Sequence, residues 1–548
     1  MFTSTRKEGA KGLIRRRRGF AAEGFELEPR LLAAVDVLTY HNDNARTGQN
    51  LAETILTPAA VGSSAFGKLG QVAVDGQVYA QPLVKTGVAI PGQGVHNVVY
   101  VATEHDSVYA FDADTLALLW HDSFINPAAG VTTVSSKDVN TTDLYPEVGV
   151  TSTPVIDPAT GAIYVVSDVK TTSAAGKAVY LQQIHALDLA TGAEKFGGPV
   201  NISASVRGKG AGSVRGLSTF DPHIENQRAA LLLSNGTVYI TWASFGDNGP
   251  YHGWVIGYDA GTLRRNSAFN LTPNGSRGGV WMSGGGLAAD AAGSIYLASG
   301  NGTFRVNRLK GDFGDSVLKL NPGAGKLAVA DYFTPGNQAK LQAKDLDLGS
   351  GGVLLVPDQT GAHPHLLVTA GKEGTIYVID RDRMGKYSRL DKTVATLPKA
   401  LPSSFDTPAY FNGKIYYVGT GERTTPGGGG GDSLKAFTLN NGVINPTPAV
   451  AAGTFGYPGA SPSVSANGAA GGVVWALDNG ASATRGPAIL RAYEAGDVTK
   501  TLYNSSLAGR GGQSGAAVKF AVPTVANGKV YVGGNGALTL YGLRTSST

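Results

Sequence analysis

One short pattern recurs along this chain and constrains its fold more than any other feature. Around Tyr100 the segment NVVYVATEHDSVYAFDADTLALLW alternates apolar and polar residues, turns, and alternates again, which is typical of consecutive antiparallel strands. The first strand of this pattern returns as AIYVVS, TVYITW, SIYLAS, HLLVTA, KIYYVG, VVWALD and KVYVGG. The chain therefore contains eight copies of one β-meander.

The same aromatic position marks nearly every copy. Trp475 and Leu367 occupy it in two copies, and tyrosine occupies it in the other six: Tyr100, Tyr164, Tyr239, Tyr296, Tyr416 and Tyr531. A role in ligand binding would not apply to all six positions, so we interpret these tyrosines as spacers packed between neighbouring sheets.

The number of copies predicts the architecture. Sheet units that repeat every roughly 50 to 75 residues cannot bury both faces alone, and they stack around an axis. Eight units predict an all-β fold, an eight-bladed β-propeller of four-stranded antiparallel blades. The C-terminal copy supplies only three strands, and residues 68–74 alternate in the way that a fourth strand requires. We therefore expect an N-terminal strand to close the ring and leave no sheet edge unpaired.

Length and composition agree with one large domain behind a separate leader. The 548 residues include 77 Gly, and only 16% are charged, which suits strands joined by tight turns. We assign residues 1–36 to a basic, export-type leader that lacks periodicity and is expected to be disordered. Residues 37–67 then form a lead-in segment, and residues 68–548 form the propeller.

Charge and residue usage exclude several classes of function. Residues 1–20 contain seven Lys or Arg and one Glu, a balance of +6, so the rest of the chain contributes about −1 to the net charge of +5. That remainder carries no basic stripe of the kind that binds nucleic acid. No run of 18 apolar residues predicts a transmembrane segment. The absence of Cys excludes disulfides, thiol nucleophiles and cysteine-ligated zinc.

The links between strands differ in length in a regular way. Links between the first and second strands of each unit are short, such as DPATG, SNGT and FNGK, and so are links between the third and fourth strands. The other two kinds of link share one face of an antiparallel meander, and they hold all the long insertions: 124–150, 197–227, 243–253, 299–316, 331–350 and 420–433. We predict that any localised function belongs to this insertion face and its central opening.

Two turn segments resemble a known propeller repeat. Ala110 to Trp120 reads AFDADTLALLW, and Ala186 to Phe196 reads ALDLATGAEKF. Both resemble the AxDxxTGxxxW repeat of the quinoprotein propellers, a family that includes alcohol and sugar dehydrogenases dependent on pyrroloquinoline quinone (PQQ). The resemblance implies that Asp and Gly form the turn and that Trp docks one blade on the next. Phrases such as YHNDNARTGQN and GKEGTIYVIDRD extend the similarity to secreted, PQQ-like propeller proteins.

A more local resemblance supplies candidate site residues. The segments SGNGTF, GDFGDSVLKLNPGAGKL and GKEGTIYVIDRDRMG resemble, in the same order, three segments that surround the cofactor in quinoprotein dehydrogenases. The resemblance implies that Asn301 is a calcium ligand, that Asp315 or Asp312 is the general base, and that Lys372 contacts the quinone. In such a site calcium polarises a quinone carbonyl, a carboxylate takes the alcohol proton, and a cation stabilises the reduced cofactor.

Three departures from the family pattern leave the function open. The adjacent-cysteine disulfide found beside the cofactor in the alcohol dehydrogenases is impossible here, although the sugar-oxidising relatives do without it. Ser316 follows Asp315 where the family has Asn, and no Glu matches the calcium-ligand segment of the third blade. Asn301 between two glycines is also typical of a turn. We therefore rank first a non-catalytic propeller that presents a binding face to a protein or polysaccharide partner. The alternative is a PQQ- and calcium-dependent quinoprotein dehydrogenase that oxidises an alcohol or sugar.

The leader holds one further motif. Leu27 to Leu32 reads LEPRLL, which resembles the LEPRxLL motif near the N-terminus of many planctomycete surface proteins. The resemblance implies an extracytoplasmic location, either periplasmic, at the cell surface or secreted.

Overall fold

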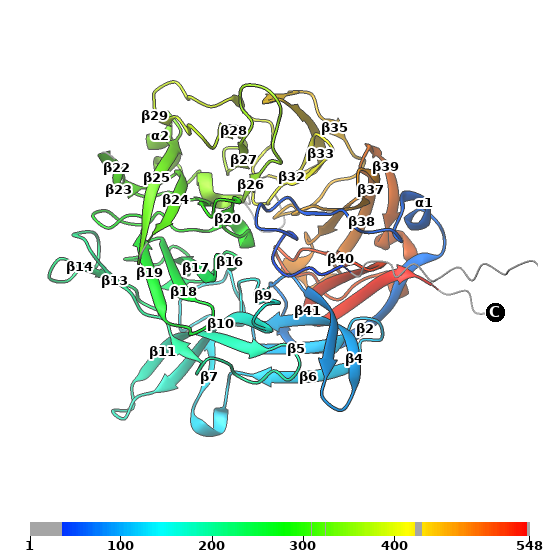
Figure 1. Cartoon of the computed structure of the whole chain (residues 1–548), viewed down its shortest axis with the longest axis horizontal. Coiled ribbons are helices and arrows are strands. Elements are labelled where there is room, and N and C mark those ends of the chain that lie inside the picture. The colour runs from blue at the N-terminus through cyan, green and yellow to red at the C-terminus, as the bar shows by residue number, and fades with distance from the viewer. Residues whose placement is uncertain (1–34, 308, 324, 422–429, 545–548) are drawn as a thin grey trace, which may run out of the picture. The chain divides into compact units, whose positions relative to one another are not determined.

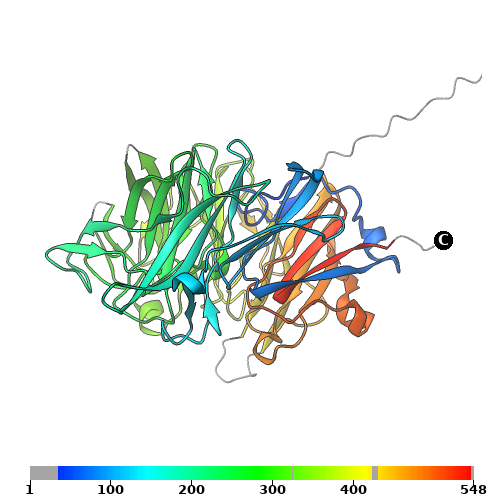
Figure 2. The same ribbon diagram turned by 90° about the horizontal axis from the view of Figure 1, so that it is seen from below.

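The computed structural model describes residues 35–307, 309–323, 325–421 and 430–544. In these residues eight antiparallel sheets surround one axis, which confirms the predicted eight-bladed β-propeller (Figure 1). The sheets stand beside one another when the molecule is turned by 90° (Figure 2). The LEPRLL motif lies outside the described residues. No helix of the described part of the chain has the length and apolar character needed to cross a membrane.

Blades 1 to 4 each contain four strands, A to D, counted outward from the axis. Blade 1 consists of β3 (Leu83–Ile90), β4 (Gly94–Thr103), β5 (Ser107–Asp112) and β6 (Leu118–Ser123), and blade 2 of β9 (Val155–Asp157), β10 (Ala162–Thr172), β11 (Ala178–Asp188) and β12 (Val200–Asn201). Blade 3 consists of β16 (Leu232–Ser234), β17 (Thr237–Ser244), β18 (Trp254–Asp259) and β19 (Arg265–Asn270), and blade 4 of β20 (Ala288–Ala289), β21 (Ile295–Ala298), β24 (Val317–Gly323) and β25 (Lys326–Thr334).

Blades 5 to 8 continue the pattern. Blade 5 consists of β26 (Val353–Leu355), β27 (Leu366–Ala370), β28 (Ile376–Asp380) and β30 (Ala395–Leu397), and blade 6 of β31 (Ala409–Phe411), β32 (Lys414–Thr420), β33 (Gly431–Asn440), β34 (Val443–Ile444) and β35 (Ala449–Val450). Blade 7 consists of β36 (Ser463–Asn467), β37 (Ala470–Asp478), β38 (Ile489–Glu494) and β39 (Asp497–Asn504), and blade 8 of β40 (Thr524–Ala526), β41 (Lys529–Leu543) and β2 (Phe66–Gln77).

Shorter elements decorate the ring. They are β1 (Gln49–Asn50), β7 (Thr132–Ser135), β8 (Glu147–Val148), β13 (Ser205–Arg207), β14 (Leu217–Thr219), β15 (Glu225–Asn226), β22 (Phe304–Asn307), β23 (Lys310–Phe313), β29 (Lys386–Tyr387), and the helices α1 (Pro58–Val61) and α2 (Gln338–Ala343). Most of them lie in the links that the sequence marked as insertions.

The N-terminal strand closes the ring, as predicted. The beginning of β41 pairs with β40, and its end pairs antiparallel with β2. This second pairing runs from Phe66 opposite Leu543 to Gln77 opposite Asn535, so it extends beyond the predicted residues 68–74. The last blade is therefore assembled from both ends of the propeller, and its two outer strands cover each other's edges.

The recurrent tyrosines join neighbouring blades. In four copies the tyrosine hydroxyl donates a hydrogen bond to a backbone carbonyl in the C–D turn of the next blade; the pairs are Tyr100–Leu189 (2.8 Å), Tyr164–Ala260 (2.7 Å), Tyr416–Ala495 (2.8 Å) and Tyr531–Ala113 (2.8 Å). The last pair connects blade 8 with blade 1. The spacer interpretation therefore acquires a polar component, because each of these four buried hydroxyls finds a partner in the next blade.

Trp120 docks blade 1 on blade 2 in a similar way. Its indole Nε1 donates to the Leu189 carbonyl at 3.0 Å. A Cβ at Gly192 would lie 2.7 Å from the Trp120 ring, and Gly192 has a φ of +74°, so only glycine fits both the turn and the ring above it. Asp188 completes this turn, since its Oδ1 accepts hydrogen bonds from the Ala190 amide and the Thr191 hydroxyl.

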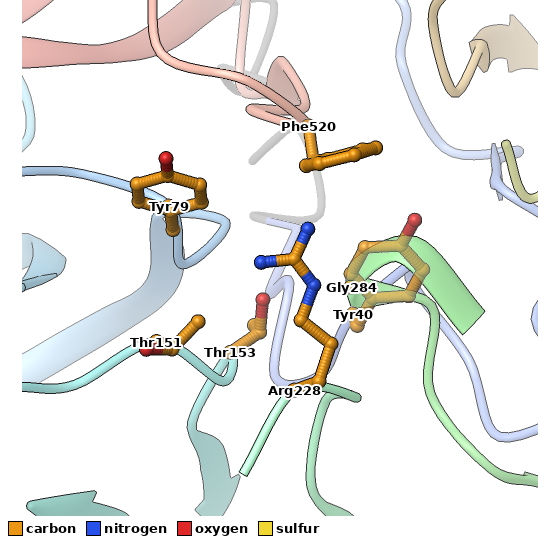
Figure 3. A pocket seen from close by; sticks show the side chains of 7 residues that line it. All are labelled: Tyr40, Tyr79, Thr151, Thr153, Arg228, Gly284 and Phe520. Carbon is orange, nitrogen blue, oxygen red and sulfur yellow. The ribbon is translucent and has the colours of Figure 1, made fainter. Parts of the chain in front are cut away.

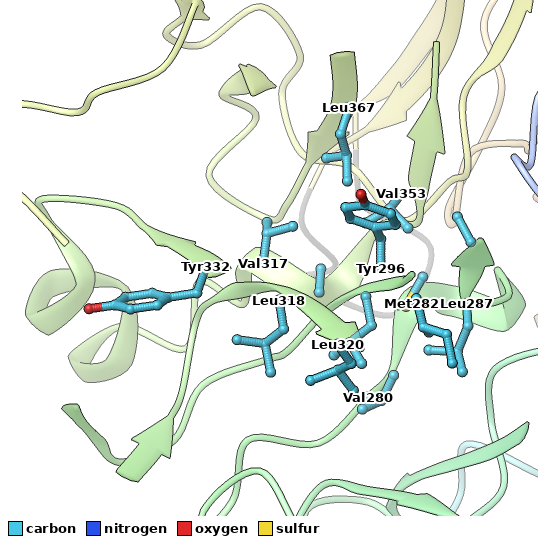
Figure 4. Close-up of a cluster of buried hydrophobic side chains, with 14 of the residues drawn as sticks. Val280, Met282, Leu287, Tyr296, Val317, Leu318, Leu320, Tyr332, Val353 and Leu367 are labelled. Carbon is cyan, nitrogen blue, oxygen red and sulfur yellow. The ribbon is translucent and has the colours of Figure 1, made fainter. Parts of the chain in front are cut away.

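Apolar side chains fill the spaces between blades. The cluster in Figure 4 extends across blades 3 to 5 and includes Tyr296 and Val317 of blade 4 together with Val353 and Leu367 of blade 5, all buried. Leu367 holds the position that tyrosine holds in other copies, and it is fully buried there. Burying an apolar side chain of this size contributes about 1.5 to 3 kcal/mol.

Residues 37–53, called here the axial segment, lie inside the ring rather than only leading into it. They form hydrogen bonds with the innermost strand of every blade, or with a residue beside it, in blade order: Val37–Val84, Leu38–Ile156, Asn44–Leu233, Asn44–Ala289, Ala45–Leu355, Thr47–Tyr410, Gly48–Val464 and Asn50–Val525. The dark-blue trace crosses the middle of Figure 1 accordingly. Because the innermost strands surround the axis, this segment fills the central opening at their level.

Arg46 anchors the axial segment. Its side chain is fully buried, and its guanidinium donates to the carbonyls of Leu287 (2.8 Å), Tyr40 (2.7 Å) and Leu231 (3.1 Å) and to the Thr39 hydroxyl (2.7 Å). Burial lowers the pKa of Arg46 to about 10, and the group stays charged at neutral pH. The planar fork of arginine suits this set of acceptors better than the single ammonium of lysine.

Candidate functional site

Three of the four predicted site residues come together between blades 4 and 5. Asn301 and Asp315 belong to the link between β21 and β24, and Lys372 belongs to the link between β27 and β28. Asp345 and Asp347, from the link between the two blades, complete the group. These five residues are called the blade 4–5 cluster below.

Two carboxylates hold the predicted ligand and the predicted cation in place. Lys372 Nζ lies 2.6 Å from Asp347 Oδ2 and 3.0 Å from Asp345 Oδ2. Asn301 donates from Nδ2 to Asp345 Oδ1 and from its backbone amide to Asp347 Oδ1, both at 2.6 Å. The same pair of aspartates therefore binds both residues, and the cluster forms a hydrogen-bonded ion-pair network.

Asp315 is buried beside this network. Its side chain has no exposed surface, and its carboxyl accepts hydrogen bonds from the Leu348 amide (3.2 Å) and from Gln338 Nε2 (3.3 Å). Burial and then the charge of Asp347 raise the pKa of Asp315 to about 8, although Lys372 opposes the shift. This carboxyl is therefore mostly protonated at neutral pH, and it lies away from solvent and from any substrate that approaches through solvent.

Asp312, the other predicted base, lies apart from the cluster. It is part of β23, where it pairs across the hairpin with Arg305 of β22. Its Oδ1 accepts a hydrogen bond from the Asn274 amide at 2.8 Å. This contact fastens the hairpin to a neighbouring loop, which is a structural role.

The cluster does not fit a calcium ion that carries a quinone. Calcium requires six to eight oxygen ligands at about 2.3 to 2.6 Å, whereas the Lys372 ammonium already neutralises Asp345 and Asp347. Asn301 Oδ1 is buried without a hydrogen-bond partner, and it offers a single ligand atom. Within the described ranges, no three His, Asp or Glu side chains are grouped so that they could hold a metal ion. Lys372 itself is the cation of this cluster.

Asp345 and Asp347 are not among the residues that the sequence predicts for the site. Both lie in the insertion 331–350, which was recognised by its length, and the segment DLDLG holds them two residues apart. No motif assigned them a role. Only the folded chain shows that this link returns across the ends of blades 4 and 5 and reaches Lys372.

A larger hollow lies on the insertion face, at blades 7, 8 and 1. It measures about 580 Å³ and is called the funnel below; its lining includes Tyr79, Tyr145, Tyr457, Arg485, Lys519 and Asn535. Apart from Gln77 at the end of β2 and Asn535 within β41, its lining residues belong to B–C or D–A links. The funnel therefore occupies the face for which the link lengths predicted function, on a different part of the ring from the blade 4–5 cluster.

A small cavity at the axis adjoins the funnel, and Tyr79 lines both. The cavity has free space of about 10 Å³, room for about one water molecule. Tyr40 of the axial segment lines it, together with residues that precede the innermost strands, among them Thr153, Arg228 and Phe520 (Figure 3). The axial segment therefore closes this inner end.

Solved structures with a similar fold include two quinohemoprotein alcohol dehydrogenases and a methanol dehydrogenase. The quinohemoprotein alcohol dehydrogenase ADHIIG from Pseudomonas putida HK5 superposes with a TM-score of 0.58 at 15% identity, over 94% of this chain and 81% of that chain. The enzyme from Comamonas testosteroni gives 0.56 at 15% identity, over 94% and 81%. A europium-containing methanol dehydrogenase gives 0.55 at 15% identity, over 93% and 98%.

These likenesses define the class of fold, a propeller of the quinoprotein alcohol dehydrogenase type. No protein-family model and no curated protein sequence matches the chain. At this level of identity the comparison establishes the fold and leaves the reaction, cofactor and substrate to be argued from the residues of this chain.

Proposed function

We propose that this protein is an extracytoplasmic binding propeller that holds a polysaccharide partner in the funnel. The observation that carries the proposal is the contrast between two places on the same face. The funnel is open and has the volume of a small-molecule site, while Lys372 in the blade 4–5 cluster is already paired with Asp345 and Asp347. A ligand therefore finds ready space at the funnel, whereas at the residues that resemble a quinone site it would have to compete with these ion pairs.

The funnel lining suits a sugar chain. Tyr145 is 56% exposed, and Tyr457 and Tyr79 line the same space. A tyrosine ring offers a flat apolar surface with a hydroxyl at its rim, which matches the apolar faces and hydroxyl edges of pyranose rings. Arg485 and Asn535 add donors for ring and exocyclic oxygens. A concave site favours the end of a chain over a flat protein interface, which needs about 800 Å² on each partner.

The extracytoplasmic location is part of the same proposal. It is supported by the LEPRLL motif in the leader and by the resemblance to secreted PQQ-like propeller proteins. Polysaccharides at the cell surface are the corresponding class of partner, and a protein partner on the insertion face is the competing outcome.

The second candidate is a PQQ- and calcium-dependent dehydrogenase that oxidises an alcohol or sugar. The order of the Asn301, Asp315 and Lys372 segments supports it. The pKa of the Asp315 carboxyl, about 8, also lies in the range that suits general acid–base catalysis. It ranks second because Lys372 is bound by Asp345 and Asp347 and because Asp315 is fully buried.

The proposal predicts that the funnel tyrosines carry binding. In affinity electrophoresis against a panel of soluble acidic and neutral polysaccharides, Tyr145→Ala and Tyr457→Ala should each weaken retardation by about tenfold, a loss of roughly 1.4 kcal/mol. Tyr387→Ala is the matched control, since Tyr387 is a comparably exposed tyrosine (46%) on β29, outside the funnel. Its retardation should equal that of the wild type.

Two results would contradict this assignment. Equal retardation of all three variants would show that the funnel is not the polysaccharide site. If no polysaccharide retards the wild type, a protein remains as the candidate partner. Titration with PQQ and calcium discriminates the second candidate: micromolar quinone binding, with dye-linked alcohol oxidation that Asp315→Asn abolishes, would establish the dehydrogenase instead.

A further inference from the structure

A buried arginine faces the small cavity without an acidic partner. The side chain of Arg228 is 8% exposed and extends between the rings of Tyr79 and Phe520 (Figure 3). The guanidinium carbon lies 4.4 Å from the centre of the Phe520 ring and 5.8 Å from that of Tyr79. Aromatic faces attract the cation, but they accept few of its five N–H donors.

No other contact satisfies these donors. Among the residues that the structure describes, Arg228 forms no ion pair and no side-chain hydrogen bond. Arg46 shows the contrast, because its fully buried guanidinium donates to three backbone carbonyls and to the Thr39 hydroxyl. A buried charge without a partner is costly, so the free donors of Arg228 indicate a group that the chain itself does not supply.

The nearest coupled acid does not take that place. Glu104 interacts with Arg228 over a distance longer than an ion pair, and its own Oε2 accepts hydrogen bonds from the Gly149 amide (2.8 Å) and the Thr151 hydroxyl (3.0 Å). Burial raises the pKa of Glu104 to about 7, so its charge is incomplete at neutral pH. The positive charge of Arg228 is therefore only partly balanced from within the protein.

The cavity offers a further donor beside Arg228. Thr153 Oγ1 accepts a hydrogen bond from the Gln81 amide at 2.9 Å, which leaves its own proton available toward the cavity. The free space is that of about one water molecule, and the axial segment closes one side through Tyr40. Size, charge and donors together select one small, singly charged anionic group.

We propose that Arg228 and Thr153 form an anion-binding site at the propeller axis, which takes a single small anionic group beneath the funnel. That group is either a free monovalent anion or a carboxylate of a funnel ligand, and both present the same chemistry to the guanidinium. The anion site does not depend on the polysaccharide proposal, because a free ion tests it without any funnel ligand.

Bromide is the probe for the free ion. At equal ionic strength, thermal unfolding of the full chain should occur roughly 2 °C or more higher in sodium bromide than in sodium methanesulfonate, whose anion has no carboxylate and is too large for the cavity. Arg228→Met should abolish the difference, and Arg228→Lys should reduce it. Arg305→Met, which removes an exposed arginine from β22, should leave the difference unchanged. Crystals grown with bromide should show an anomalous peak at hydrogen-bond distance from Arg228.

The outcomes distinguish a free ion from a ligand carboxylate, and they distinguish failure of the anion site from failure of the proposed function. Competition between bromide and a uronic acid disaccharide assigns the site to a ligand carboxylate, and bromide binding without competition assigns it to a free ion. Identical unfolding of the wild type in bromide and methanesulfonate, with no anomalous peak, overturns the proposal. If Arg228→Met does not fold, three measurements still test the anion site. They are the comparison of salts with the wild type, the anomalous peak, and the unfolding of Arg228→Lys. Polysaccharide binding with no bromide effect leaves the proposed function standing and removes only the anion site.

Discussion

At the scale of single residues, the surroundings of a side chain decide its role more than its type. Asp315 and Asp312 lie three positions apart, and both matched the family base from sequence. One is fully buried within a charged cluster, and the other ties a hairpin to a loop. Lys372 matched a quinone contact, and it forms ion pairs with two aspartates. Asn301, Asp315 and Lys372, which the resemblance singled out, lie in one cluster, and their neighbours set what each does.

The raised pKa of Asp315 predicts a pH-dependent cost to stability. The folded pKa is about 8 and the unfolded value is about 3.9, so between these values the folded state binds the extra proton. The contribution of this proton to the free energy of unfolding is complete below about pH 4. It declines as the pH rises toward 8, by at most about 1.4 kcal/mol per pH unit. Asp315→Asn removes this decline.

Urea denaturation from pH 5 to 8 measures this effect. The Asp315→Asn variant should gain stability relative to the wild type steadily across that range, with Asp345, Asp347 and Lys372 unchanged. Asp312→Asn, outside the cluster, should keep the wild-type dependence on pH. A constant difference between Asp315→Asn and the wild type would show that this carboxyl titrates normally.

At the scale of elements, the axial segment connects blades that are distant in the chain. It forms hydrogen bonds with the innermost strands of all eight blades in order, while the tyrosine hydroxyls connect only adjacent blades. The two systems are complementary, because the tyrosine hydroxyls connect blades around the ring and the axial segment connects them at its centre. The axial segment also closes the inner end of the funnel, so it shapes the proposed binding site.

Arg46 is the most sensitive point of this element. Replacing it by Met leaves the carbonyls of Leu287, Tyr40 and Leu231 buried without donors, and we expect a loss of about 3 kcal/mol or more in the free energy of unfolding. Arg305→Met, at an exposed position, should change it by less than about 0.5 kcal/mol. Equal denaturation midpoints for the two variants would mean that the axial segment contributes little to the ring.

At the scale of the whole molecule, stability depends on ring closure. The two ends of the propeller meet in blade 8, where β2 and the end of β41 pair over their lengths. The Tyr531 hydroxyl then connects this blade to blade 1. An open ring would expose strand edges on both sides of the gap together with the apolar faces between blades.

Truncation from the two ends tests closure. Removing residues 529–548 deletes β41 and should cost at least about 5 kcal/mol, comparable with the entire stability of many domains; circular dichroism on heating should show no cooperative transition. Removing residues 1–34, a longer piece, should leave the transition unchanged, because the sequence predicts a dispensable leader. Val35 and Asp36 are retained, since they contact Asn527, Thr86 and Lys85. A C-terminal truncation that melts like the full chain would refute closure.

The sequence by itself determined the repeat and its direct consequences: eight meanders, aromatic spacers, a strand missing from the last blade, and short turns on one face, except in blade 5, where residues 356–365 and 381–394 form longer links. These properties are local or periodic, so alternation and turn residues reveal them. Only the tertiary structure decided the roles of residues 37–53, Arg228, Asp345 and Asp347. They lie in links without periodicity, and their partners are distant in the chain and come near only when the ring closes. Burial and charge at such positions are properties of the assembled ring, and no short stretch of sequence encodes them.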